Sequence, residues 1–291
     1  MSTSSSIPKC DIKHGSIICD WKVIRKIGSG GFGTVYEVEK DGIRGALKTE
    51  IVDQTGKRRE TLTNEVKQLR VMQWSDHFCR LYLACRLHYG KETVNIMIMI
   101  LMERSLSRLR RMTPERRFTR STAVRLSRQC LELNLNDQGN IKHRSPRKRV
   151  AFFGTDNYCS LNMHRRLDQG RRDDLWSWLY MTVEFMAGSL IWHNDDVKVI
   201  ERKKEKIGSR LLLKCPQEMF TVYDHIRFLE YNSKPNYILL QRQLNRICAR
   251  LGCSEDQPYD WEDGGYYHHY YVKKSDTEKE LSDGQKELKH V

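Results

Sequence analysis

A glycine-rich loop, IGSGGFG at residues 27–33, lies between two stretches in which apolar and polar residues alternate. Alternation with a period of two predicts strands, so residues 21–50 are expected to form strand, loop, strand, turn and strand, with Asp41-Gly42 as the turn. Val35, Val38 and Leu47 are the apolar members of this pattern. A short loop between two predicted strands indicates a β-hairpin.

The glycines Gly28, Gly30 and Gly33 have the spacing G-x-G-x-x-G, which alone is a weak signal. It fits a dinucleotide-binding turn, a lid over nucleotide phosphates, or an ordinary hairpin. A dinucleotide-binding turn must be followed by a helix, whereas TVYEVEK at residues 34–40 alternates as a strand. The pattern therefore favours the phosphate lid.

Two charged residues sharpen this interpretation. Lys48 lies in the third predicted strand, where its ammonium group could reach the phosphates of a nucleotide. Glu65 lies on a predicted helix within residues 58–72, on the same face as Leu62 and Leu69. Since a carboxylate on an apolar face needs a cation, Lys48 is its expected partner. Two unrelated surface charges remain the alternative.

The second part of the chain predicts helices. Residues 121–132, 216–231 and 236–252 are amphipathic, and residues 173–192 are apolar nearly all round, as in a helix at the centre of a domain. Gly188 is the expected end of that central helix. Residues 1–16 are predicted to be a disordered lead and residues 263–291 a flexible charged tail. The layout is thus a strand-rich lobe at about 17–102 and a helical lobe at about 103–262.

Composition excludes several classes of protein. No apolar run is long enough to cross a membrane, and the polar start MSTSSSIPKC lacks a secretory signal, so we expect a cytoplasmic or nuclear protein. Nine cysteines without a C-x-x-C pair predict reduced thiols and no metal site. The net charge of +14 falls mainly between Arg104 and Arg172, which favours acidic or phosphorylated protein partners over nucleic acid.

Several stretches together resemble a protein kinase of the casein kinase 1 group, close to the tau-tubulin kinases. They are MIMILMERSLSRLRR from residue 97, GTDNYCSLNMH from residue 154, GRRDDLWSWLYMTVEFMAGSLIW from residue 170, YNSKPNYILLQRQL from residue 231 and DQPYDWE from residue 256. The resemblance spans about Trp21 to Trp261. It implies an α+β fold of two lobes, a monomer, and transfer of phosphate from ATP to protein serine or threonine.

The catalytic segment of that family is missing from this chain. The family needs a His-Arg-Asp-x-x-x-x-Asn loop for the general base and one magnesium ligand, and an Asp-Phe-Gly for the other. Residues 133–154 contain neither; they contain His143-Arg144-Ser145 and Phe152-Phe153-Gly154 instead. About 35–40 residues of the family layout are absent. An excision between a helix and the following loop is the simplest account, and it leaves the helical lobe incomplete.

The resemblance assigns roles to individual residues. ATP is expected to lie against Ile27, Gly28, Ser29, Gly30, Gly31, Phe32, Gly33, Val35, Lys48, Glu65, Met99 as gatekeeper, and Leu101 in the hinge. Substrate is expected to face Arg147, Lys148, Arg149, Thr155 and Tyr158, and Asp174 has a structural role in the helical lobe. The family's arginines in the substrate strip are replaced by Phe153 and Asn157, so its substrate preference does not carry over.

Three interpretations stay open at this point. The chain could be a serine/threonine kinase using magnesium and ATP, a pseudokinase that holds nucleotide or a protein partner, or an incomplete product of a gene whose full-length form is active. Because no residue supplies the missing base or magnesium ligands, the sequence predicts that this chain is catalytically inert. Sequence alone assigns no catalytic residue and no metal ligand.

Overall fold

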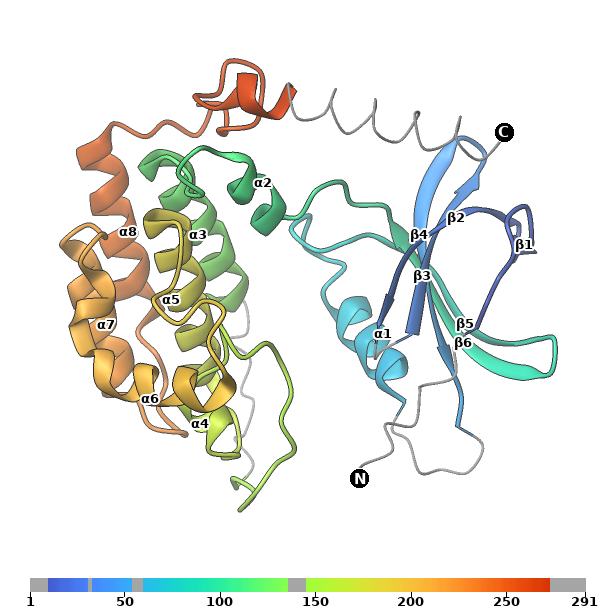
Figure 1. Ribbon diagram of the computed structural model, residues 1–291, viewed down its shortest axis with the longest axis horizontal. Helices are drawn as coiled ribbons and strands as arrows, with labels where there is room; N and C mark the ends of the chain where they lie inside the picture. Colours follow the sequence, from blue (N-terminus) through green and yellow to red (C-terminus); the bar gives the residue numbers. More distant parts are fainter. Residues whose placement is uncertain (1–9, 31–32, 54–59, 136–144, 273–291) are drawn as a thin grey trace. The chain divides into compact units, whose positions relative to one another are not determined.

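The computed structural model of the chain describes residues 10–30, 33–53, 60–135 and 145–272, without the side chains of 133–135 (Figure 1). The chain divides into two compact units, Met1–Glu103 and Arg104–Val291. The first unit is a sheet with one helix, and the second is helical. This arrangement confirms the predicted α+β fold.

The sheet unit contains six antiparallel strands in the order β1-β2-β3-β4-β6-β5. Their bounds are β1 Ile17–Ile18, β2 Trp21–Gly30, β3 Gly33–Lys40, β4 Ile43–Ile51, β5 Leu81–Tyr89 and β6 Glu92–Ile100. Helix α1, Thr61–Val71, follows β4. The predicted hairpin turn is present at Asp41-Gly42, since Lys40 pairs directly with Ile43. The alternating residues Val23, Val38 and Leu47 are fully buried on one face of the sheet, as the period of two requires.

The start of the chain differs from its prediction as a disordered lead. Cys10 and Ile12 are buried in the core of the sheet unit. The Tyr36 hydroxyl, also buried, donates to the carbonyl oxygen of Cys10 at 2.6 Å and accepts from the Ile12 amide at 2.9 Å. The buried phenol needs both partners, so the segment from Cys10 is ordered. Residues 1–9 lie outside the described residues.

The helical unit is built around one central helix. Its elements are α2 Leu106–Met112, α3 Arg120–Leu135, α4 Leu161–His164, α5 Arg171–Ala187, α6 Val197–Ile207, the 3-10 helix η1 Gly208–Leu212, α7 Glu218–Arg227 and α8 Tyr237–Leu251. Helix α5 buries side chains on most of its circumference, among them Leu175, Leu179 and Val183. It ends at Gly188, whose φ of +90° suits glycine. The predicted central helix and its end are therefore confirmed.

Residues after α8 cover the start of α3. The carboxylate of Asp260 accepts from the Thr119 amide at 2.7 Å and from the hydroxyls of Thr119 and Thr122 at 2.6 and 2.8 Å. Tyr271 is buried in the core of the same unit. Residues 263–272 thus differ from the predicted flexible tail, because Tyr267 and Tyr271 pack into the core of the helical unit. Residues 273–291 lie outside the described part. None of the described helices combines the length and apolarity needed to cross a membrane.

Candidate nucleotide-binding site

Strand β4 and helix α1 bring together the two charges singled out in the sequence. Lys48 Nζ lies 2.5 Å from Glu65 Oε2, with the lysine side chain 20% exposed and the glutamate side chain 43% exposed. Leu62 and Val66 bury the neighbouring face of α1 against Met97 of β6. The helix is therefore anchored on the sheet, and its carboxylate holds the lysine amine at the protein surface.

Glu50, two residues after Lys48 on β4, fixes the start of α1. Its carboxylate accepts from the amide and hydroxyl of Thr61 at 2.8 and 2.6 Å and from the Leu62 amide at 3.1 Å. A carboxylate that accepts the free amides of a helix N-terminus stabilises the helix. Lys48 and the residue that orients its partner helix thus come from the same strand. Sequence reasoning missed Glu50, although its position two residues from Lys48 puts both on one face of β4.

The glycine-rich loop joins β2 and β3. Gly28, Ser29 and Gly30 end β2, and Gly33 begins β3. Gly33 has φ of +119°, and a Cβ there would lie 1.8 Å from the carbonyl oxygen of Thr49. Only glycine allows β3 to approach β4 this closely at that point. Gly31 and Phe32 lie outside the described residues.

Four further residues were assigned to ATP in the sequence. Ile27 on β2 is an exposed apolar side chain, and Val35 on β3 pairs directly with Lys48. Met99 on β6 pairs with Ala46 and packs beside Leu62 of α1, while Leu101 follows the end of β6. The sheet unit therefore places Val35 in register with the lysine. The nucleotide-binding roles stay predictions.

The residues expected to face substrate fall into two groups. Lys148, Arg149 and Thr155 are exposed. Arg147 is also exposed, but its guanidinium binds the buried carboxylate of Asp168, with Nη2 donating to Oδ1 at 2.9 Å. Its charge is thus partly neutralised by an acid within the protein. Arg144, another arginine of the same basic stretch, lies outside the described residues.

Tyr158 is half-buried, and its hydroxyl turns toward the interior of the helical unit; its substrate-facing role stays a prediction. Its hydroxyl donates to Glu184 Oε2 of α5 at 2.5 Å. Burial, followed by the hydrogen bond to Glu184, raises the pKa of Tyr158 to about 12. The buried carboxylate of Glu184 also pairs with Arg110 at 3.0 Å. A buried charge is costly unless it is paired and hydrogen-bonded. The Tyr158 hydroxyl provides one of the hydrogen bonds to the buried Glu184 carboxylate.

At the start of α5, the buried carboxylate belongs to Asp173. It accepts from the Gly170 amide at 2.9 Å and from Asn162 Nδ2 at 2.8 Å, which caps the helix. Asp174, to which the sequence assigned a structural role, is exposed. Exposure to water avoids the cost of burying its charge.

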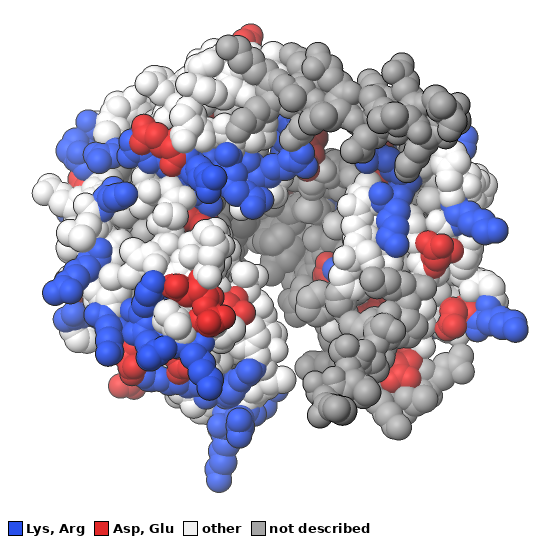
Figure 2. Space-filling model, in the orientation of Figure 1, with Lys and Arg blue, Asp and Glu red and all other residues white. Residues whose placement is uncertain are grey.

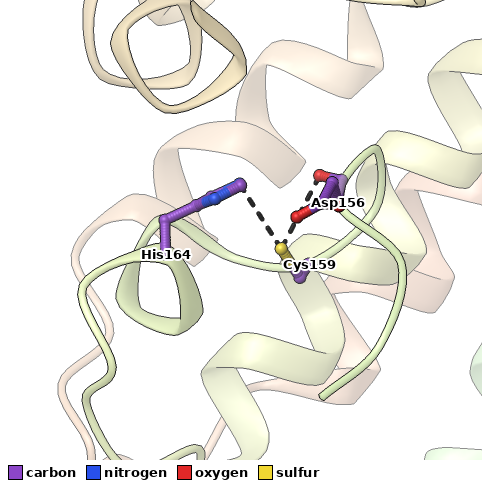
Figure 3. Close-up of side chains that lie close together, drawn as sticks. All are labelled: Asp156, Cys159 and His164. Atoms are coloured by element: carbon purple, nitrogen blue, oxygen red, sulfur yellow. Dashed lines mark hydrogen bonds between the residues drawn. The ribbon is translucent and has the colours of Figure 1, made fainter. Parts of the chain in front are cut away.

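A second cluster lies on helix α4 and the loop before it, where Asp156, Cys159 and His164 point toward one another (Figure 3). Cys159 Sγ lies 3.4 Å from His164 Nε2. Lys204 of α6 reaches the same place: its Nζ donates to the carbonyl oxygens of Asp156 and Cys159, both at 2.6 Å. Sequence reasoning missed this cluster because it searched only for cysteine pairs.

Burial controls the protonation of this cluster. It raises the pKa of the Cys159 thiol, which favours the neutral thiol. It lowers the pKa of His164, with the nearby Lys204 charge adding to the effect. Burial also lowers the pKa of Lys204 to about 8. Among the described residues this is the single group of three or more His, Cys, Asp or Glu side chains close enough to share a metal ion.

Comparison with known proteins identifies relatives that match most of the chain. It is 31% identical to a probable serine/threonine-protein kinase of Dictyostelium discoideum, over 83% of this chain and 56% of that protein. It is 29% identical to a putative serine/threonine-protein kinase of Caenorhabditis elegans, over 83% of this chain and 82% of the relative. It is 25% identical to a probable casein kinase I homologue of Encephalitozoon cuniculi, over 79% and 85% of the two chains.

The chain thus spans just over half the length of the Dictyostelium relative and most of the other two. No protein-family model matches the sequence. All three relatives carry the name of a kinase. The fold, an antiparallel sheet followed by a helical unit, agrees with that name. This chain is similar to serine/threonine protein kinases, among them a probable casein kinase I homologue.

Proposed function

We propose that this chain is a pseudokinase: its sheet unit binds ATP, and the chain does not transfer phosphate. The observation that carries the proposal is a contrast within one sequence. The Lys48–Glu65 ion pair is formed at 2.5 Å, whereas residues 133–154 contain neither motif that would supply a general base or magnesium ligands.

The sheet unit supports nucleotide binding through three features. The Lys48 amine is held by Glu65 but stays partly exposed, so it can also reach phosphate oxygens. Glu50 fixes α1, which carries Glu65. Gly33 brings the glycine-rich hairpin close to Thr49, next to Lys48 on β4. A lid above a positioned ammonium group is the arrangement that kinases use to hold the phosphates of ATP.

The alignment supports the loss of a segment. The Dictyostelium alignment extends over 287 residues but covers 83% of the 291 residues of this chain, which is about 242, so about 45 aligned positions have no residue here. This agrees in size with the missing catalytic segment. A cavity of about 570 Å³ in the helical unit, bordered by Cys130 of α3 and Trp178 of α5, is consistent with the same loss.

Without that segment, chemistry is expected to fail. A positioned general base contributes about 10²–10⁴ in rate. The magnesium ions neutralise the charge that develops on the phosphates, and both of their protein ligands belong to the absent motifs. Within the sheet unit, two carboxylates close to this site are already used, Glu65 by Lys48 and Glu50 by the start of α1. ATP binding is therefore expected to need no magnesium.

Binding is tested by titrating the purified chain with a fluorescent ATP analogue, with and without magnesium. We expect saturable binding that ATP reverses, and a loss of about tenfold or more in affinity for Lys48→Met, because the charge-assisted contacts to phosphate disappear. Lys40→Met is the matched control, since Lys40 lies on the neighbouring strand and pairs with Asp20 at the surface. Equal binding by wild type and Lys48→Met would contradict the proposal.

Transfer is tested separately with radiolabelled ATP and casein as acceptor. We expect wild type and Lys48→Met to show the same background. Phosphate transfer that requires both magnesium and Lys48 would show that the chain is an active kinase.

The alternative is that this chain is an incomplete product of a gene whose full-length form is an active kinase. The unmatched positions in the alignment fit it as well as they fit a pseudokinase. Sequencing the transcript across the Glu132 to Asn136 junction distinguishes the two: an exon encoding the missing motifs identifies an incomplete product, whereas an uninterrupted genomic sequence identifies a pseudokinase. In either case the exposed Lys148 and Arg149 are the proposed contacts for an acidic protein partner.

A further inference from the structure

We propose that Asp156, Cys159 and His164 form a binding site for a divalent cation of the zinc class. The site lies wholly within the helical unit and involves none of the residues assigned to ATP, so it stands or falls independently of nucleotide binding. Thiolate, imidazole and carboxylate are the three ligand types that zinc accepts in proteins.

The distances fit a tetrahedral centre. Zinc lies about 2.3 Å from sulfur and about 2.0–2.1 Å from imidazole nitrogen, so a tetrahedral site separates these two atoms by about 3.5 Å. Cys159 Sγ and His164 Nε2 are 3.4 Å apart. One ligand atom from each of the three side chains lies within 4.8 Å of the others. Small side-chain rotations would therefore bring all three onto one ion.

The backbone of the site is already fixed. The Cys159 amide donates to the Thr155 carbonyl at 2.9 Å, and the hydroxyl of Ser160 caps α4, which carries His164. Trp192, fully buried, donates through its indole nitrogen to the carbonyl oxygen of Asn157 at 3.0 Å. Ligands held on a preorganised backbone lose little entropy on binding.

Lys204 is the competing cation in this cluster. Its Nζ lies 3.2 Å from His164 Nε2 and 4.0 Å from Cys159 Sγ. A metal ion therefore needs the Lys204 amine to withdraw from the imidazole. The thiolate and carboxylate balance the charge of the dication. The repulsion from Lys204 lowers the affinity, and we expect binding in the micromolar range, weaker than at a site without a neighbouring cation.

The test uses cobalt(II), which reports its ligands by absorption. Titration of the wild-type chain is expected to give a thiolate-to-cobalt charge-transfer band and the visible bands of tetrahedral cobalt, both removed by zinc. Cys159→Ser is expected to abolish the charge-transfer band. His164→Gln and Asp156→Asn are each expected to weaken binding by more than about tenfold, since even partners outside the ligand shell contribute that much.

Two other close pairs of thiols require controls. Cys19 and Cys85 lie 3.9 Å apart, and Cys253 lies next to Cys248. All titrations are therefore made in a chain that carries Cys19→Ser and Cys248→Ser, with Cys215→Ser as a matched single-thiol control. Circular dichroism and thermal melting check that each variant is folded.

No thiolate band in the folded background chain would overturn the proposal, and so would a band that persists in Cys159→Ser. Nucleotide binding is measured in the same samples with and without a chelator. We expect the chelator to leave it unchanged, so the failure of one proposal is distinguishable from the failure of the other.

Discussion

The two units of this chain keep different parts of a kinase. In the sheet unit the two charges proposed to serve ATP binding are in contact: Lys48 pairs with Glu65, and Glu50 holds the start of α1. In the helical unit the central helix α5 and its core are present, but the sequence lacks the segment that would carry the base and the metal ligands. One unit thus contains the residues proposed to bind ATP, and the other contains a helical core without the two sequence motifs of catalysis.

The difference shows that residues outside the missing catalytic segment form the core of the helical unit. Leu175 and Leu179 of α5 and Trp192 beyond it are fully or almost fully buried, and none belongs to the missing motifs. Burial of such side chains contributes about 1.5–3 kcal/mol each. The helical unit is therefore expected to fold without the two catalytic motifs. Figure 2 shows several groups of basic side chains over this unit, with fewer acidic side chains among them.

The largest expected effect concerns the buried ion pair of the helical unit. Glu184→Ala leaves Arg110 as an uncompensated charge, because the two side chains pair at 3.0 Å with exposures of only 2% and 4%. We expect the free energy of unfolding of this unit to fall by about 3–5 kcal/mol. Urea denaturation with hydrogen exchange measures it, since exchange reports the two units separately.

The matched control is Glu115→Ala. Glu115 pairs with Arg117 at the surface of the same unit, and its loss is expected to cost at most about 1 kcal/mol. If the two units are stabilised separately, amides of β3 and β4 keep their protection in Glu184→Ala. Equal loss of protection in both units would show that they unfold together and would break the comparison.

A smaller effect is expected at the glycine-rich hairpin of the sheet unit. Gly33→Ala places a Cβ against the Thr49 carbonyl at a φ of +119°, so the strands must separate locally. We expect a loss of about 1–3 kcal/mol in the stability of this unit. We also expect nucleotide affinity to fall by about tenfold, or about 1.4 kcal/mol. Thermal melting and titration with the fluorescent ATP analogue measure the two effects.

Gly30→Ala is the control for that variant. A Cβ at Gly30 meets no atom within 4 Å, and its φ is not positive, so stability should change little. The same loss of affinity in both variants would mean that flexibility of the loop, rather than the close approach at Gly33, governs binding.

The sequence predicted the features that depend on local pattern. The strands, the Asp41-Gly42 turn and the central helix follow from periodicity, and the Lys48–Glu65 pair follows from a carboxylate placed on an apolar helix face. Glu50 was missed because its partners, the first amides of α1, become available only when that helix packs beside β4.

Contacts across the chain explain the remaining differences. The sequence places Cys10 and Ile12 in a polar N-terminal segment. In the structure their backbone groups form hydrogen bonds with the Tyr36 hydroxyl, 24 or more positions away. Tyr158 was assigned to substrate, but the buried Glu184 lies 26 positions further along the chain and attracts it. Lys204 reaches the Asp156–Cys159–His164 cluster from α6. No spacing rule in the sequence connects these partners, so only the folded chain shows them.

The smallest expected effect on stability concerns an ion pair at the surface of the helical unit. It can be compared with the buried Glu184–Arg110 pair of the same unit. Arg250 of α8 binds Glu218 of α7 through two hydrogen bonds at 3.0 and 2.8 Å, and this lowers the pKa of Glu218. A carboxyl whose pKa is lower in the folded state adds stability above its unfolded pKa of about 4.3. That contribution disappears as the pH falls through the folded value.

Glu218→Gln should therefore lower the free energy of unfolding by less than about 1 kcal/mol at pH 7, with the difference from wild type vanishing in acid. Urea denaturation at several pH values between neutrality and about pH 3 measures it. Asp224→Asn is the control, because Asp224 and Arg227 form a more exposed pair with a longer separation of 3.3 Å. A difference that stays constant across this pH range would mean that Glu218 stabilises the unit by packing, since packing does not depend on the charge of the carboxyl.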